Sequence, residues 1–486
     1  MGVLDGLKPE GVYRFFEEIS EIPRGSGNEK GISDYLVGFA QKRGLRVYQD
    51  NALNVIIYKP GTDGYESSPP VIVQGHMDMV CEKNADTVHD FETDPLKLLV
   101  DGDYVKALGT TLGADNGVAV AYALALLDSA DIPHPPLEVV MTVAEEVGLE
   151  GAARIEADKL SAMRMINMDC GGEGTFTTSC AGGLRASIHF NIERADVPKG
   201  YAFVRAMVKG LVGGHSGGDI HRERANANVL LGRLLYALNE KFDICLVEIE
   251  GGAKDNAIPR EAYAVLAVSG ADLAAFESEA AAYEAVFRNE FRNTDPEMEL
   301  VSERLTDRPL SDRVLDKKLF RNVVAAIILT PNGVQAMDTN IEGMVETSNN
   351  LGSIRMTGTE IVLTNAIRSS SVSRKKMIEA RIHALAECLG AKAISGSDYP
   401  AWEYSKDSAL RKTFVDTYTE MYGSEPVVTG IHAGLECGVF SGKMPGLDMI
   451  AFGPDTPGVH TPDERMSISS VARVWEFLLE IMKRLK

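Results

Sequence analysis

The chain has 486 residues, of which 45% are hydrophobic and 24% are charged, and its formal net charge at pH 7 is −21. This length exceeds that of one ordinary hydrophobic core, so the sequence predicts a soluble globular protein with two domains. The excess of acidic residues argues against nucleic acid and anionic membrane surfaces as partners, and no apolar run approaches the roughly 18 residues of a membrane span.

Strand-like and helical segments alternate in the first part of the chain. Buried strands are predicted at 54–58, 71–74, 137–143 and 163–168, and helices at 29–43 and 116–129. This alternation is typical of a mostly parallel sheet that is covered by helices on both faces. The expected fold class is therefore α/β.

The pattern changes near residue 184. Segments 184–192 and 202–209 alternate in the manner of half-exposed antiparallel strands, and helical patterns follow at 221–240, 271–292 and 372–389. After about residue 397 the α/β character returns, with a strand at 448–452 and a closing helix. We therefore expect a discontinuous catalytic domain formed by residues 1–184 and 398–486, and an inserted α+β domain formed by residues 185–397.

Five potential metal ligands end or follow apolar segments: His76, Asp115, Glu146, Asp169 and His460. Because ligands gather at the carboxyl ends of strands in open α/β sheets, we expect these side chains to converge. Zinc accepts imidazole nitrogen and carboxylate oxygen and keeps one position for water in catalytic sites. If two cations share Asp115, each of them obtains one histidine and one further carboxylate. The set as a whole favours a two-metal hydrolase.

Two further acids lie beside these ligands. Asp78 is two residues from His76 in extended chain, so it can accept a hydrogen bond from the ring nitrogen that does not bind metal. Glu145 precedes Glu146, and neighbouring side chains diverge, so one can bind metal while the other reaches a metal-bound water. Taken singly, each residue also has an ordinary structural interpretation: a solvated turn, a helix N-cap at Asp115, or a solvated acidic pair. Cys170 is expected to be a small buried side chain rather than a thiolate ligand.

At this point the chain resembles the co-catalytic zinc metallopeptidases. The motifs that carry the resemblance are Gly-His-Met-Asp (75–78), Gly-Ala-Asp-Asn-Gly (113–117), Glu-Glu-Val-Gly (145–148), Asp169 and His460. Segments 213–221, 226–228 and 432–438 resemble the branch of aminoacyl-histidine dipeptidases, also called cytosolic non-specific dipeptidases. The resemblance covers nearly the whole chain, and it implies a zinc-exopeptidase-like sheet with an inserted lid domain.

The resemblance implies a role for each residue of the set. His76 and Asp169 would hold one metal, Glu146 and His460 the other, and Asp115 would bridge them. Glu145 would act as the general base on a metal-bridged water, and Asp78 would orient His76. An aspartate at position 169 resembles the amino- and dipeptidases more than the carboxypeptidases.

The inserted domain is expected to supply substrate contacts. By resemblance, His215 would stabilise the oxyanion, Asn256 would bind the substrate carbonyl, and Arg368 would bind the free carboxylate, for which Gly434 offers a backbone N–H. Arg355 and Arg374 are alternatives to Arg368. The segment Gly214-His215-Ser216-Gly217-Gly218 also fits the nucleophile elbow of a serine hydrolase, although the predicted helix begins too late for it.

The sequence therefore predicts a dipeptidase with two divalent cations, zinc first and cobalt or manganese as alternatives, acting on small peptides. Substrates would be Xaa-His or a broad range of dipeptides. The alternatives are the serine hydrolase and a catalytically silent peptide-binding or amino-acid-binding protein. The chain shows neither a signal peptide nor CxxC spacing among its cysteines, so we expect a cytoplasmic protein, either a monomer or a homodimer through residues 185–397.

Overall fold

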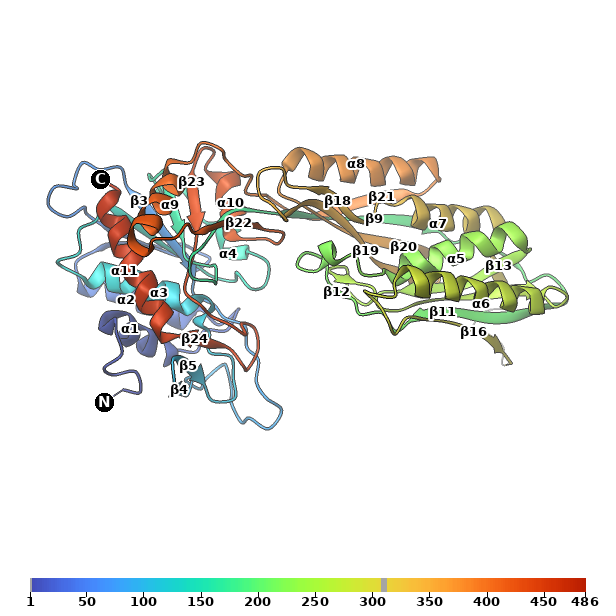
Figure 1. Cartoon of the computed structure of the whole chain (residues 1–486), viewed down its shortest axis with the longest axis horizontal. Helices are drawn as coiled ribbons and strands as arrows, with labels where there is room; N and C mark the ends of the chain where they lie inside the picture. Colours follow the sequence, from blue (N-terminus) through green and yellow to red (C-terminus); the bar gives the residue numbers. More distant parts are fainter. Residues whose placement is uncertain (1, 307–312) are drawn as a thin grey trace. The chain divides into compact units, whose positions relative to one another are not determined.

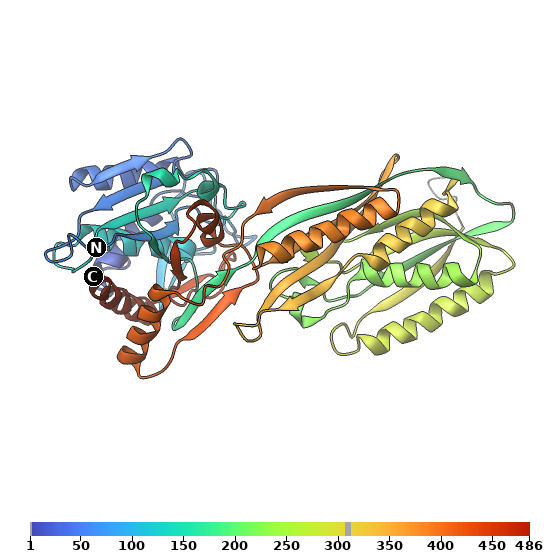
Figure 2. The same ribbon diagram turned by 90° about the horizontal axis from the view of Figure 1, so that it is seen from above.

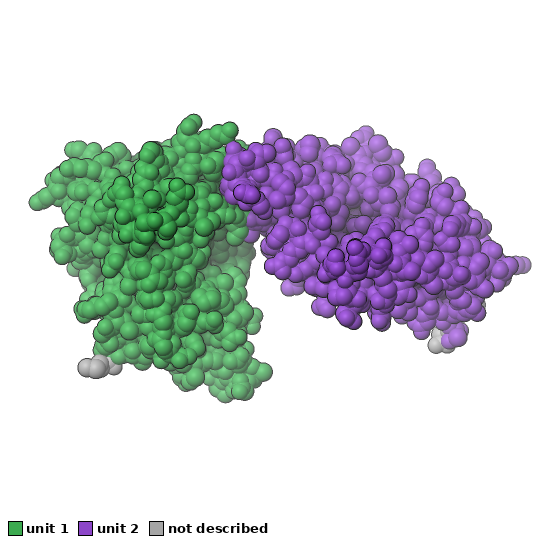
Figure 3. Space-filling view, viewed as in Figure 1, with its two compact units in different colours: residues 1–180, 402–431, 435–486 green, residues 181–401, 432–434 purple. Residues whose placement is uncertain are grey.

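The computed structural model describes residues 2–306 and 313–486 (Figure 1). The chain divides into two compact units, which Figure 3 shows in different colours. Unit 1 comprises the described residues up to Cys180 together with Trp402–Ile431 and Leu435–Lys486, and unit 2 comprises Ala181–Ala401 and His432–Gly434. Among the described residues, none of the helices is both long enough and apolar enough to cross a membrane.

Unit 1 is built on a sheet in the order β1-β2-β6-β3-β7-β23-β8-β22. Its strands are β1 (Arg46–Gln49), β2 (Val55–Lys59), β3 (Val71–His76), β6 (Leu137–Thr142), β7 (Arg164–Asn167), β8 (Thr175–Cys180), β22 (Val427–Ile431) and β23 (Asp448–Ala451). The central run β6-β3-β7-β23 is parallel throughout. Strands β3 and β6 are buried on both faces, which explains why each contains an unbroken apolar stretch (71–73 and 139–141) rather than an alternating pattern.

Helices cover this sheet. They are α1 (Glu10–Ser20), α2 (Lys30–Lys42), α3 (Ala114–Asp128), α4 (Glu150–Arg154), α9 (Ala409–Tyr422), α10 (Glu436–Lys443) and α11 (Ile468–Arg484). Helix α3 is buried almost all round, as its uniformly apolar sequence requires, whereas α1 and α11 bury one apolar stripe each. A small antiparallel sheet joins β4 (Leu98–Asp101), β5 (Tyr104–Ala107) and β24 (Arg465–Ser467). The predicted α/β class with a mostly parallel sheet is confirmed.

Unit 2 contains an antiparallel sheet in the order β16-β11-β15-β13-β19-β20-β9-β21, with β18 paired to β19. Its strands are β9 (Gly182–Asn191), β11 (Tyr201–Lys209), β13 (Ile244–Gly251), β15 (Ala262–Ser269), β16 (Glu299–Leu305), β18 (Gly333–Met337), β19 (Val345–Met356), β20 (Glu360–Ser369) and β21 (Lys392–Tyr399). Buried positions alternate with partly or fully exposed ones along β20 and most of β9 and β11, because one face of each strand packs into the core. Short ladders pair β10 (Arg194–Asp196) with β17 (Arg313–Leu315), and β12 (Gly214–His215) with β14 (Ala257–Ile258).

Four helices pack on the buried face of this sheet (Figure 2). They are α5 (Ala227–Lys241), α6 (Leu273–Glu290), α7 (Lys317–Leu329) and α8 (Val372–Cys388). The helix predicted at 221–240 begins later than expected, at Ala227, because the Asn226 side chain accepts the amides of Asn228 and Val229 and caps it there. Helix α7 and several strands of the sheet, β19 and β20 among them, were not predicted.

Candidate metal centre

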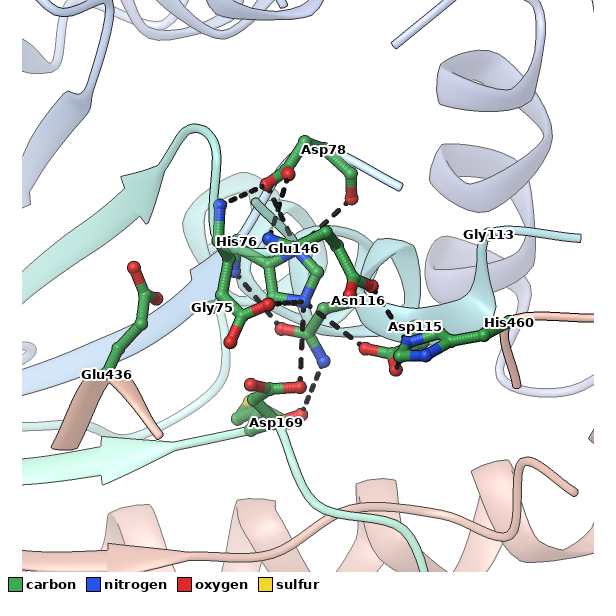
Figure 4. Close-up of polar contacts among 12 residues, drawn as sticks. Gly75, His76, Asp78, Gly113, Asp115, Asn116, Glu146, Asp169, Glu436 and His460 are labelled. Atoms are coloured by element: carbon green, nitrogen blue, oxygen red, sulfur yellow. Dashed lines mark hydrogen bonds and ion pairs between the residues drawn. The ribbon is translucent and has the colours of Figure 1, made fainter. Parts of the chain in front are cut away.

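The ligands predicted from the sequence come from one edge of the unit 1 sheet. His76 is the last residue of β3, Glu146 follows β6, and Asp169 follows β7. His460 lies in the segment after β23, and Asp115 stands in the first turn of α3. Since β6, β3, β7 and β23 are parallel neighbours, their carboxyl ends lie together. Figure 4 shows the five side chains turned toward one another.

Asp115 lies between the two histidines. Its Oδ1 is 3.2 Å from Nε2 of His76, and its Oδ2 is 3.3 Å from Nε2 of His460. Each histidine also faces a second carboxylate: His76 Nε2 is 3.6 Å from Asp169 Oδ1, and His460 Nε2 is 3.1 Å from Glu146 Oε1. The site therefore contains two imidazole–carboxylate pairs, His76 with Asp169 and His460 with Glu146, and the carboxylate of Asp115 lies between the two pairs.

Asp78 contacts the ring nitrogen of His76 that does not face Asp115. Its Oδ1 is 3.2 Å from Nδ1 of His76, whose opposite ring nitrogen faces Asp115. The same carboxylate accepts the backbone N–H groups of Glu145 at 3.1 Å and of Glu146 at 3.3 Å, and the hydroxyl of Ser26 at 2.8 Å. Burial opposes ionisation of Asp78, but these hydrogen bonds hold its pKa below the usual range. Asp78 therefore fixes the His76 ring and the start of the Glu145-Glu146 segment together.

Glu145 also faces His76, with its Oε2 4.0 Å from the Nε2 of that ring. Burial raises the pKa of Glu145 well above its ordinary value; the charge on His76 opposes this shift, and the Asp169 carboxylate adds to it. A carboxyl group with a raised pKa can accept a proton and release it near neutral pH, as a general base must.

The donor set fits divalent cations. Two imidazole nitrogens and three carboxylates face one another, and the ligand atoms of His76, Asp115 and Glu146 all lie within 4.8 Å of one another. Burial raises the pKa of Asp169 to about 6, and hydrogen bonds to Asp115 and Glu146 raise the pKa of His460 to about 10. The cluster of carboxylates thus favours positive charge at its centre, which bound cations would supply.

Cys170 follows Asp169 directly. Burial, with a further effect from the Asp169 carboxylate, raises the pKa of the Cys170 thiol to about 12. The neutral thiol is a poor metal ligand, since the thiolate is the form that binds. This supports the expectation that Cys170 is not a thiolate ligand, although its side chain is half-buried rather than buried.

Asn116 connects three ligand-bearing segments, a role the sequence did not reveal. Its Oδ1 accepts the backbone N–H of His76 at 3.2 Å, and its Nδ2 donates to the carbonyl of Met168 at 2.8 Å. It also follows Asp115 in the chain, so it couples the ends of β3 and β7 to the start of α3. A Cβ at Gly75 would lie 2.4 Å from Asn116 Oδ1, which explains the glycine before His76.

Arg24 and Glu464 hold the turn that carries Asp115, and both are 2% exposed. Arg24 donates to the carbonyl of Gly113 at 2.6 Å and to that of Met77 at 3.2 Å. Glu464 accepts three amides: Oε2 from Leu112 at 2.8 Å and Gly113 at 2.9 Å, and Oε1 from Asp115 at 3.1 Å. Two buried opposite charges therefore fix the turn from both sides.

Replacing Glu464 with glutamine should weaken metal binding. The amide oxygen can keep the two bonds to Leu112 and Gly113, but the amide NH2 group then faces the N–H of Asp115, donor against donor. We expect affinity to fall by about 10- to 100-fold, as for other residues that orient metal ligands. Competition with a graded chelator measures it, and exposed Asp463→Asn in the same segment is the control. Equal affinity in Glu464→Gln and the parent would show that the turn does not depend on this carboxylate.

A second buried network reaches Asp169 from α10. The backbone N–H of Asp169 donates to Asn167 Oδ1 at 3.1 Å, and Asn167 Nδ2 donates to Gln74 Oε1 at 2.5 Å. Gln74 Nε2 donates to Glu436, which also accepts the Thr142 hydroxyl at 2.7 Å. In this series of hydrogen bonds, each donor lies on the Asp169 side and each acceptor on the Glu436 side. Burial raises the pKa of the Glu436 carboxyl to about 7.

The predicted substrate contacts lie in unit 2. The ladder of β12 and β14 pairs His215 with Ala257, next to Asn256, and Gly434 is in the short segment of unit 2 that follows β22. His215 Nδ1 accepts the amides of Gly217 at 3.3 Å and Gly218 at 3.1 Å, so its proton resides on Nε2. Arg368 Nη2 is 3.4 Å from that nitrogen. Nε2 of His215 and Nη2 of Arg368 both carry hydrogen, so neither accepts a hydrogen bond from the other. Together they can donate to an oxygen acceptor.

The serine elbow is not supported. Ser216 is 1% exposed, and the next α-helix begins only at Ala227. An elbow serine instead stands exposed at the start of its helix. Ser216 is therefore buried where a nucleophile would need access.

Comparison with known proteins agrees with the geometry. A model of peptidase family M20/M25/M40 matches residues 72–484. The cytosol non-specific dipeptidase of Escherichia coli (strain K12) is 38% identical over 486 residues, covering 100% of this chain and 99% of the relative. The crystal structure of aminoacylhistidine dipeptidase from Vibrio alginolyticus has a TM-score of 0.93 at 37% identity, covering 99% of this chain and 98% of that chain.

More distant structures share the fold. The aminopeptidase PepT from Bacillus cereus ATCC 10987 covers 99% of both chains with a TM-score of 0.56 at 15% identity. The family model spans most of the chain, and the Escherichia coli relative is similar along its whole length. On these findings the chain belongs to peptidase family M20/M25/M40.

Proposed function

We propose that this protein is a metal-dependent dipeptidase that hydrolyses the peptide bond of short substrates. The observation that carries the proposal is the placement of Asp115 between His76 and His460, with one carboxylate oxygen facing each imidazole. Glu145 stands beside this group, which gives the site an acid that metal binding does not need. Membership of a peptidase family and the names of the two full-length relatives support the same function.

Within this proposal, His76 and Asp169 would hold one divalent cation, Glu146 and His460 would hold the other, and Asp115 would be shared by both. The bound cations would polarise the scissile carbonyl and lower the pKa of water at the site towards about 7. Imidazole and carboxylate donors suit zinc, and cobalt or manganese are accepted by the same donor types.

The chain's own groups move the proton and hold the substrate. Glu145 takes a proton from the attacking water on its carboxylate and delivers it to the nitrogen of the leaving amine. Asp78 keeps the His76 ring in place through Nδ1. His215, with its proton on Nε2, donates to the carbonyl oxygen as negative charge develops there.

The substrate's ends are recognised in unit 2. Arg368 suits the free C-terminal carboxylate because a guanidinium can donate two parallel hydrogen bonds. The backbone N–H of Gly434 supplements it, and Asn256 binds the substrate carbonyl. These contacts favour dipeptides over longer chains, whose second residue carries no carboxylate.

The name of the Escherichia coli relative supports a cytoplasmic location, and the names of both relatives support dipeptides as substrates, including those with a C-terminal histidine. For assembly we propose a monomer, or a homodimer formed through residues 185–397.

A dipeptide panel measured with and without a chelator tests the function. We expect hydrolysis of several dipeptides, Xaa-His among them, loss of activity on chelation, and recovery when zinc, cobalt or manganese is added back. Tripeptides and N-terminally blocked peptides of matched composition serve as controls for substrate length. Hydrolysis that survives complete removal of metal would contradict the proposal.

A further inference from the structure

A cavity of about 140 Å³ lies beside the metal centre in unit 1. Its walls come from the start of α3, the end of β7 and the segment after β23. Most of the lining side chains are apolar, among them Val118, Met168 and Val459. The polar ones include Thr456 and two of the proposed ligands, Asp115 and Asp169.

The position of the cavity relative to the reacting groups is informative. Among the described residues, its lining includes Asp115 and Asp169 but not His76, Glu145 or Glu146. The cavity therefore adjoins the ligand cluster without being the space between the histidines that the cations would occupy. Glu145, the group that would deliver a proton to the leaving amine, does not line it.

We propose that this cavity is the subsite for the side chain of the substrate's N-terminal residue. The inference rests on the proposed dipeptidase function. The leaving amine belongs to the C-terminal residue and must reach Glu145, so we assign the acyl half of the dipeptide to the cavity, whose lining includes Asp115 and Asp169 but not Glu145. Its lining suits aliphatic and small aromatic side chains. Its volume is close to that of a cavity of about 150 Å³ that admits benzene in another protein.

Gly171 controls the width of this subsite. A Cβ at this position would lie 3.4 Å from Thr456 Oγ1 and 3.9 Å from Pro454 O, both ordinary van der Waals distances. Alanine therefore fits without displacing either neighbour. Both neighbours line the cavity, so the added methyl group would occupy space that the substrate side chain uses.

Gly171→Ala is tested on Xaa-Gly dipeptides whose N-terminal residue is Gly, Ala, Leu or Phe. We expect kcat/KM for Leu-Gly and Phe-Gly to fall by about tenfold or more, because one methylene in an apolar pocket changes discrimination by about 10- to 200-fold. Gly-Gly should change by less than about twofold, and metal content should stay the same. Gly38→Ala, on α2 with open space around its Cβ, is the matched control.

Val459→Ala provides the opposite change, because it removes two methyl groups from the wall and should raise the preference for Phe-Gly over Ala-Gly. An equal loss for all Xaa-Gly substrates in Gly171→Ala, no loss, or an effect that follows the C-terminal residue in an Ala-Xaa series would overturn the subsite. A parent protein that cleaves no dipeptide would overturn the proposed function and the subsite with it. A parent that cleaves the panel while Gly171→Ala shows no dependence on the N-terminal side chain would overturn the subsite alone.

Discussion

Replacing Glu145 with glutamine is expected to lower kcat for dipeptides by about 10²- to 10⁴-fold while both cations stay bound. Glutamine preserves the size of the side chain but cannot accept and return a proton. The backbone N–H of residue 145 still donates to Asp78 Oδ1, so the local structure should persist. Steady-state kinetics and elemental analysis on the same preparation measure the two properties.

Glu150→Gln is a suitable control for Glu145→Gln. Glu150 is another acid of the same loop region, at the start of α4, but its side chain is 53% exposed and pairs with Arg154. This variant should keep the activity and the metal content of the parent. If Glu145→Gln hydrolyses dipeptides at a rate near that of the parent, Glu145 is not the base.

Glu146→Gln should have the opposite signature, with loss of metal. Glu146 Oε1 is 3.1 Å from His460 Nε2, and removal of its charge leaves the second proposed cation with His460 and the shared Asp115 only. Changes to residues that merely orient ligands cost about 10- to 100-fold in affinity, so loss of a ligand should cost at least that much. Elemental analysis after dialysis is expected to find about one cation per chain, and dipeptide hydrolysis should fall with it.

The pair of variants separates two adjacent acids by independent measurements. Unchanged metal stoichiometry in Glu146→Gln would contradict its assignment as a ligand. Metal loss in Glu145→Gln with retention in Glu146→Gln would show that the two roles are exchanged.

The α/β class could be predicted because the strands and helices of unit 1 are recognisable from short local patterns in the sequence. Strands β3 and β6 contain the unbroken apolar stretches 71–73 and 139–141, and β3 ends in His76 while Glu145 and Glu146 follow β6 closely, so polarity indicates both the sheet and its functional edge. The closeness of His76, Asp115 and His460 follows from the rule that parallel strands share their carboxyl ends. Their roles as ligands stay predictions.

The residues that hold the site could not be predicted from local pattern. Arg24 and Glu464 are 440 positions apart along the chain and both lie fully within the fold beside the Asp115 turn, yet single charged residues are usually exposed. Glu436 lies in segment 432–438, which carries part of the resemblance, but its buried contacts have no local signal because its partners Gln74 and Thr142 come from two strands far away in the chain. Such contacts depend on tertiary packing and have no periodic signal.

In unit 2, hydrophobic periodicity is a weaker guide to the elements. The helical pattern at 221–240 predicts a start near residue 221, but a short 3-10 turn at Ile220–Arg222 precedes the cap at Asn226. Strands β19 and β20 pair with each other in a long antiparallel ladder. Several polar residues of β19 are buried and make hydrogen bonds inside the fold, so polar residues do not mark the exposed positions of this strand. A pattern based on polarity cannot recognise such a strand.

The most direct test of the account is metal reconstitution of the chelated protein. Zinc is added stepwise to metal-free protein, and bound metal and dipeptide hydrolysis are measured on each sample. We expect no hydrolysis before metal is added, and a plateau of activity at two cations per chain. Two results would contradict a two-metal mechanism. One is full activity in the metal-free protein, and the other is a plateau at one cation per chain together with unchanged activity when Asp115 or His460 is substituted.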